Sequence, residues 1–138
     1  MDLEIWKQQM QPLLGEKVDL QKVLGGGMSK QQSEERRLTL WGADTVDEIN
    51  AKQKSVSALS LISADDPPIF MSYGMSPTAK PPSDPNRAKG WLIHHVFFGI
   101  ALKEKMDSLN VESNLNHGGA KSTYESSAEF MIEKLLKE

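Results

Sequence analysis

A short apolar run over residues 69–73 constrains the fold of this chain more than any other feature. The run follows a turn-like segment at 65–68, ends before Gly74 and reads Ile69-Phe70-Met71-Ser72-Tyr73. A run of this length between proline and glycine is typical of a strand, and apolar residues at most positions are typical of a strand buried on both faces. The pattern therefore predicts a strand of an α/β fold, with a neighbouring strand on each side.

The segments after this run predict a helix and a second strand. The helix is expected over 95–109, where one face carries Phe98, Ala101, Leu102, Met106 and Leu109. Residues 111–115 are the second candidate strand, and residues 116–119 are the turn after it. Because a helix joins the two strands, they are expected to pair in parallel through a right-handed crossover.

A last helix completes a predicted βαβα unit. Ser122 and Glu125 have the spacing of a capping box, so the helix is expected to begin there. The residues predicted to face inward are Tyr124, Ala128, Met131 and Leu135. The prediction for the fold class is α/β, with this unit preceded by short helices.

Two domains are expected, a helical and loop segment at 1–54 and an α/β segment at 55–138. Within the first, residues 3–14 place Leu3, Trp6, Met10 and Leu13 on one helical face, and the glycines at 25–27 would stop a second short helix. Capping-box spacing occurs twice more, at Ser29 with Gln32 and at Thr45 with Glu48. Residues 56–62 are the one other stretch that could add a strand, and the proline-rich residues 75–90 predict a loop.

Composition excludes several classes of protein. Sixteen Lys and Arg against nineteen Asp and Glu give a net charge of −3, which disfavours binding of nucleic acid through phosphate neutralisation. The chain has no cysteine, which excludes disulfides, thiolate nucleophiles and cysteine-based zinc sites and fits the cytoplasm. No apolar run approaches the ~20 residues that cross a bilayer, so no membrane partner is expected.

No metal or cofactor is expected either. His94 and His95 are adjacent, so on a helix their side chains would point about 100° apart and could not readily share one ion. Asp65 and Asp66 precede Pro67 and fit a turn that needs no calcium. The glycines at 25–27 lack the Gly-Lys-Ser/Thr ending of a phosphate loop.

The second half of the chain resembles the closing segment of bacterial α/β-hydrolases of the carboxylesterase and lipase type. Three parts carry the resemblance: the stretch 61–74, with its Asp-x-Pro-Pro-like lead into a buried strand, the helix at 101–112 that feeds a last strand, and Gly118-Gly119 before a closing helix. The match covers residues 55–138. The resemblance implies a parallel sheet and ester hydrolysis through a serine acyl-enzyme.

The chain departs from this family at all three positions of the catalytic triad. The family's serine stands in Gly-x-Ser-x-Gly, and no such motif occurs here, since neither Ser29 nor Ser76 has the flanking glycines. The family's acid would fall near Ser76, and the nearest carboxylate is Asp84. The family's histidine would follow the Gly-Gly pair, whereas His117 precedes it and Ala120 follows it.

The resemblance therefore implies that His117 is the general base, that Asp84 orients it, and that the serine comes from outside this chain. His117 has two other interpretations, an exposed loop histidine and part of an oxyanion loop in the sequence Asn116-His117-Gly118-Gly119-Ala120. The expected substrate is a small ester, and the isolated chain is expected to be inactive.

A two-stranded parallel sheet leaves both of its edges open. The chain is therefore expected to pair with a missing N-terminal hydrolase part or to form a homo-oligomer. The alternative function is a non-catalytic α/β module that oligomerises or binds a partner.

Overall fold

A computed structural model describes residues 27–136, except for the side chains of residues 85 and 86. The described chain forms two compact units, each treated separately below. One contains residues 27–61 and 80–93, and the other contains residues 62–79 and 94–136. The expected helix at 3–14 and most of the glycine stop at 25–27 lie outside the described residues.

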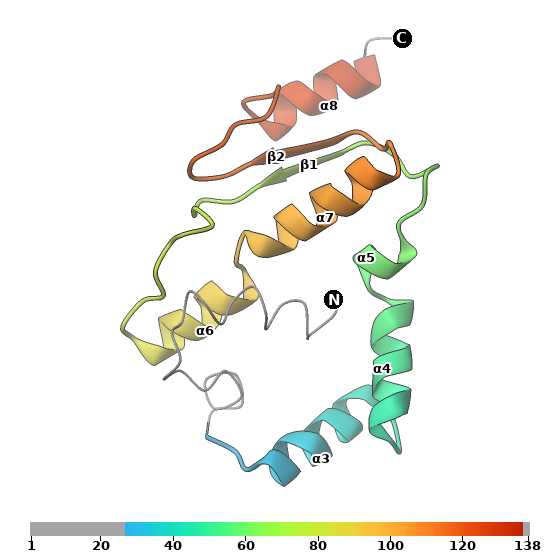
Figure 1. Cartoon of the computed structure of the whole chain (residues 1–138), viewed down its shortest axis with the longest axis vertical. Coiled ribbons are helices and arrows are strands. Elements are labelled where there is room, and N and C mark those ends of the chain that lie inside the picture. Colours follow the sequence, from blue (N-terminus) through green and yellow to red (C-terminus); the bar gives the residue numbers. More distant parts are fainter. Residues whose placement is uncertain (1–26, 137–138) are drawn as a thin grey trace. The chain divides into compact units, whose positions relative to one another are not determined.

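The first unit is helical (Figure 1). It contains α3 (Lys30–Trp41), α4 (Val46–Ser55), α5 (Ala58–Leu61) and α6 (Pro85–Ile93). The capping box predicted at the start of α3 is confirmed, because Gln32 N–H donates to Ser29 Oγ at 3.2 Å and Ser29 N–H donates to Gln32 Oε1 at 3.0 Å. The helix ends at Gly42, whose φ of 53° is one that glycine adopts without strain.

A lysine joins α4 to the end of α3. The Lys52 ammonium donates to the carbonyl oxygens of Trp41 at 2.9 Å and Gly42 at 2.5 Å, where the helix leaves its last acceptors unsatisfied. Thr45 Oγ1 caps α4 by accepting from Glu48 N–H at 3.2 Å. The Glu48 carboxylate accepts from Asp44 N–H rather than from Thr45 N–H, so the predicted reciprocal pair is only half present.

One alternative that the sequence left open in this unit is excluded, and one prediction is wrong. Residues 56–62 do not add a strand, because Ser60 N–H and Leu61 N–H both donate to Ser57 O and close the helical turn of α5. The segment 75–90 is not all loop, because α6 begins at Pro85. Proline fits the first position of a helix, and Asp84 Oδ1 accepts from Arg87 N–H at 2.9 Å as an N-cap.

The second unit confirms the parallel strand pair. It contains β1 (Ile69–Ser72), α7 (Phe97–Ser108), β2 (Ser113–Asn116) and α8 (Ser127–Leu136). β1 and β2 run in parallel, with Ile69 opposite Ser113 and Ser72 opposite Asn116. Among the described residues this is a two-stranded sheet, and α7 and α8 lie on its two sides (Figure 1). The fold is therefore mixed α and β around a parallel pair.

The strands alternate their side chains between these two helices. On the α7 side, Leu115 packs beside Gly99. On the same side, the hydroxyl of Ser113 donates to Asp107 Oδ1 at 2.9 Å, and Lys103 pairs with the same carboxylate. On the α8 side, the aromatic rings of Phe70 and Phe130 pack against each other, with 5.9 Å between their centroids.

The predicted inward face of the last helix is partly wrong. Its N-cap is Ser126, four residues later than expected, whose Oγ accepts from Glu129 N–H at 3.1 Å. The Glu129 carboxylate accepts from Glu125 N–H at 2.8 Å rather than from Ser126 N–H, so the capping box is again only half present. Tyr124 is buried as expected, but from the loop before α8. Phe130 is the buried residue of α8, while Met131 and Leu135 are 50% and 65% exposed, and Ala128 is exposed too.

Gly99 allows the Tyr73 ring to lie against α7. A Cβ built on Gly99 would overlap Tyr73 Cε2 and come within 2.9 Å of Leu115 Cδ1. We expect Gly99→Ala to lower the free energy of unfolding by ~1–3 kcal/mol, because overpacking outweighs the gain in helix propensity. Urea denaturation followed by circular dichroism measures this change.

Gly90→Ala in α6 is the matched control, because no atom lies within 4 Å of a Cβ built at that position. It is expected to leave stability unchanged or to raise it by up to ~1 kcal/mol. Equal stability of Gly99→Ala and the wild type would contradict the close packing of Tyr73.

Candidate functional site

The candidate site lies where β1 and β2 end. Tyr73 N–H donates to Asn116 O at 2.8 Å and closes the ladder between the two strands. Beyond this bond the chain leaves β1 into residues 74–79 and leaves β2 into residues 117–124. The carboxyl ends of parallel strands are where α/β proteins commonly place ligands and reacting groups.

The two loops touch through their backbones. Gly118 N–H donates to Met75 O at 3.2 Å. A Cβ built on Gly118 would lie 3.0 Å from Ser76 N and 3.2 Å from the Met75 carbonyl carbon. The loop after β2 therefore rests directly on the loop after β1, and a Cβ would fit between them only if the loops moved apart by a few tenths of an ångström.

His117 is held at this edge by a tight turn. Its N–H donates to Ala120 O at 2.9 Å, and Ala120 N–H donates to His117 O at 3.1 Å. Gly119 makes the turn possible with a φ of 111°. His117 is half-buried, and its Nδ1 lies 3.2 Å from Gly118 O. With the proton on Nδ1, that nitrogen donates to the carbonyl and Nε2 carries the lone pair that can accept a proton.

Asn116 supports the loop that carries His117. Its Nδ2 donates to Tyr124 O at 2.8 Å, and its Oδ1 accepts from Ser122 N–H at 2.5 Å. Both groups belong to the segment just before α8, so a single amide joins the end of β2 to the far end of the loop. Ser122 Oγ also donates to Tyr124 O at 3.2 Å.

The structure places Asp84 in the first unit and His117 in the second. Asp84 is the N-cap of α6, where one carboxylate oxygen accepts from Arg87 N–H. Its interaction with His117 stays a prediction.

The two serines weighed as nucleophiles have local partners. Ser29 Oγ accepts from Gln32 N–H at the start of α3. Ser76 Oγ lies 3.3 Å from Thr78 Oγ1. Ser76 is on the loop that Gly118 contacts, but among the described contacts no hydrogen bond joins its hydroxyl to His117.

The adjacent histidines form a loop pair between α6 and α7, as the sequence indicates. His94 is exposed, whereas His95 is fully buried and its Nδ1 accepts from Phe97 N–H at 3.3 Å. Burial lowers the pKa of His95, because removal from water disfavours the charged imidazole. Within residues 27–136, no three His, Asp or Glu side chains come together in a way that would hold a metal.

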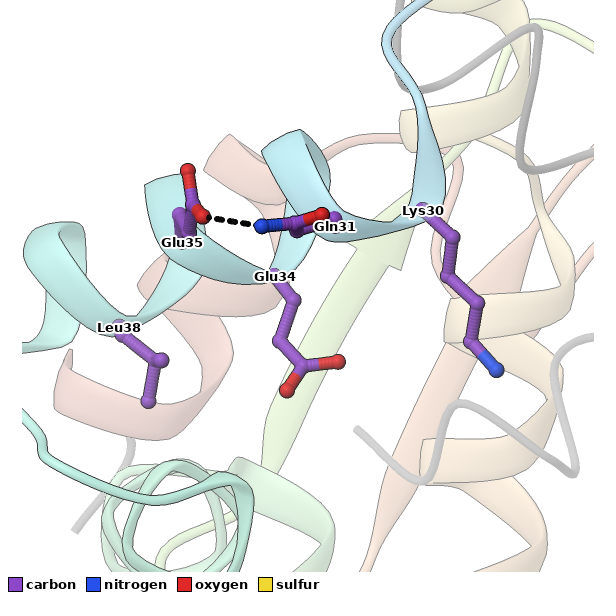
Figure 2. A pocket seen from close by; sticks show the side chains of 5 residues that line it. All are labelled: Lys30, Gln31, Glu34, Glu35 and Leu38. Atoms are coloured by element: carbon purple, nitrogen blue, oxygen red, sulfur yellow. Dashed lines mark hydrogen bonds between the residues drawn. The ribbon is translucent and has the colours of Figure 1, made fainter.

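A hollow of about 430 Å³ on the surface of α3 does not provide a second site (Figure 2). Its lining side chains among residues 27–136 all belong to that one helix, and Gln31 and Glu35 are bonded to each other at 3.0 Å. Enclosed ligand sites are formed by side chains that converge from several elements, and a single helix face lacks that convergence.

At the opposite end of the strands, a pair of charges joins α8 to β2. Lys134 Nζ lies 2.6 Å from Glu112 Oε2, and Asn114 Nδ2 donates to Glu112 Oε1 at 3.0 Å. The contact with Lys134 lowers the pKa of Glu112, and the contact with Glu112 raises the pKa of Lys134. These groups are bonded to one another, so their role is structural.

Comparison of the chain with models of protein families, with curated proteins and with solved structures finds no significant match. No helix in the described part of the chain is long and apolar enough to cross a membrane.

Sequence reasoning missed two residues of this edge, Gly118 as a contact and Asn116 as a brace. The sequence indicated the Gly-Gly pair as a turn, as part of the resemblance and as part of a possible oxyanion loop, but not as a contact with the loop after β1. An asparagine at the end of a strand gives no sign of which distant backbone groups it will bind.

We expect Asn116→Ala to lower the free energy of unfolding by ~1–3 kcal/mol, because it leaves Ser122 N–H and Tyr124 O without their amide partner. Chemical denaturation measures the loss. Ser72→Ala is the control, since Ser72 is an exposed residue at the end of the paired strand β1. Equal stability of both variants would show that the Asn116 amide does not brace the loop.

Proposed function

We propose that residues 55–138 are the closing βαβα part of an α/β-hydrolase-like sheet related to carboxylesterases and lipases. The observation that carries the proposal is the parallel pairing of β1 and β2, with His117 held at their carboxyl edge. This is where the resemblance in sequence implies a general base. The nucleophilic serine is supplied by polypeptide other than these 138 residues, because no Gly-x-Ser-x-Gly occurs among them.

The free edge of β1 supports a larger sheet. Ile69 N–H and Tyr73 N–H both donate toward β2, to Glu112 O and Asn116 O. In a parallel ladder the intervening residues direct their backbone groups to the other side, so Phe70 and Ser72 present them where no described strand lies. A further strand can pair there.

In the proposed reaction, His117 Nε2 takes the proton of the serine hydroxyl while the serine oxygen attacks the ester carbonyl carbon. The bond to the alcohol breaks, and the imidazolium returns the proton to the leaving alkoxide. Water then repeats the sequence on the acyl-enzyme and releases the acid. Gly118 O can accept a hydrogen bond from Nδ1–H, and the role of Asp84 stays a prediction. The substrate is a small ester, and no metal or cofactor is required.

The purified chain alone is expected neither to hydrolyse a fluorogenic short-chain ester nor to react with a fluorophosphonate probe. Labelling that Ser76→Ala or Ser29→Ala removes would contradict the external origin of the serine. A complex with a polypeptide that carries the Gly-x-Ser-x-Gly turn is expected to be labelled. His117→Asn in that complex should reduce the labelling rate by ~10²–10⁴-fold, and the exposed His94→Asn should leave it unchanged.

A second candidate, a module that oligomerises or binds a partner, is favoured by the outer surface of α8. Four large apolar side chains there are each half or more exposed, namely Met131, Ile132, Leu135 and Leu136. Their positions in the sequence place them on one side of the helix, opposite the buried Phe130. Apolar surface gathered in this way commonly marks an interface.

If this module is the function, light scattering should report a monodisperse dimer or a larger assembly. Ile132→Lys should dissociate it, because a buried charge at an apolar interface is costly. Leu40→Lys is the matched control, since Leu40 is an even more exposed apolar residue and lies on α3. Aggregation of the isolated chain would favour the proposal that it is a segment of a hydrolase. A well-folded monomer would count against both proposals.

A further inference from the structure

We infer that Gly118 is a positioning residue for His117, acting through its backbone contact with the loop after β1. The inference rests on the role proposed above for His117 as a general base. It adds the backbone contact that positions the imidazole. Neither the Gly-Gly motif nor the pattern of the catalytic triad specifies this contact.

The backbone around Gly118 is closely packed against the loop after β1. Its N–H is bonded to Met75 O, and the position of a Cβ is taken up by the backbone of Met75 and Ser76 at 3.0–3.2 Å. A flexible side chain can rotate away from such a contact, but a backbone carbonyl carbon and amide nitrogen move only with their whole loop. A Cβ at this position therefore requires the two loops to move apart by a few tenths of an ångström.

A displacement at Gly118 reaches His117 directly. The two residues are adjacent, and the paired bonds between His117 and Ala120 make the turn a small rigid unit. The carbonyl oxygen of Gly118 is also the neighbour of His117 Nδ1 at 3.2 Å. Gly118 thus bears on the location of the ring, and its carbonyl oxygen is an acceptor for a proton on Nδ1.

Two other glycines near this edge show that the constraint is specific. A Cβ built on Gly74 or Gly119 meets no atom within 4 Å. Gly119 is needed for its positive φ, whereas Gly74 has neither constraint. Gly74→Ala is therefore the matched control, since it makes the same chemical change in the loop on which Gly118 rests.

The test is amide hydrogen exchange and imidazole NMR on the full 138-residue chain. In the wild type, the Gly118 amide is expected to exchange more slowly than the Gly119 amide relative to their intrinsic rates, by about three- to tenfold, the effect of one ordinary hydrogen bond. Equal protection of the two amides would overturn the inference without any variant.

Gly118→Ala is expected to remove the protection at residue 118 and to shift the His117 ring resonances, while the Tyr73 amide stays protected by β2. Gly74→Ala should change none of these. Unchanged His117 resonances in Gly118→Ala would overturn the inference. Loss of protection at Tyr73 equal to that at residue 118 would also overturn it, because the glycine would then support the whole sheet.

The outcome is separable from that of the proposed function. His117→Asn removes the imidazole and keeps the turn, so Gly118 protection should persist in that variant even where labelling is lost. Slow exchange at Gly118 together with labelling that does not depend on His117 would leave the loop contact in place and refute the role of the histidine as base.

Discussion

The parallel pairing of β1 with β2 is the constraint on which the rest of the second unit depends. Parallel strands end at the same edge, so residues more than forty positions apart in sequence meet there, and the Tyr73–Asn116 bond marks the point. The loops that follow can touch only because this register is kept. A shift of one residue would turn Leu115 away from α7 and separate Gly118 from Met75.

Small side chains decide how closely the layers approach. Gly99 lets the Tyr73 ring lie against α7, and Gly118 lets one loop backbone lie on another. Neither glycine needs an unusual φ, so their role is the absence of a Cβ rather than conformational freedom. Polar side chains complete the arrangement, because Asn116 braces the loop after β2 and Lys134 with Glu112 joins α8 to the start of that strand.

Two surfaces of the second unit, the open edge of β1 and the outer surface of α8, are not covered by described residues. Phe70 and Ser72 direct backbone groups away from β2, and the outer surface of α8 is apolar. Both features are expected of a piece of a larger assembly, whether that is a hydrolase sheet or an oligomer. The proposed hydrolase role rests on the carboxyl edge, where His117 is held beside the ends of β1 and β2.

The sequence by itself determined the existence, order and direction of the two strands, α7 and the caps at Ser29 and Thr45, because apolar runs and capping residues act over a few positions. The second strand was expected at 111–115 and lies at Ser113–Asn116, since its ends depend on pairing with β1. The tertiary structure decided what depends on distant groups. Which face of α8 is buried depends on where the helix begins, at its cap Ser126, and on its contact with β1. As a result Phe130 is buried in place of Met131. The contacts of Gly118 and Asn116 exist only once β1 and β2 are paired, and no local pattern encodes them.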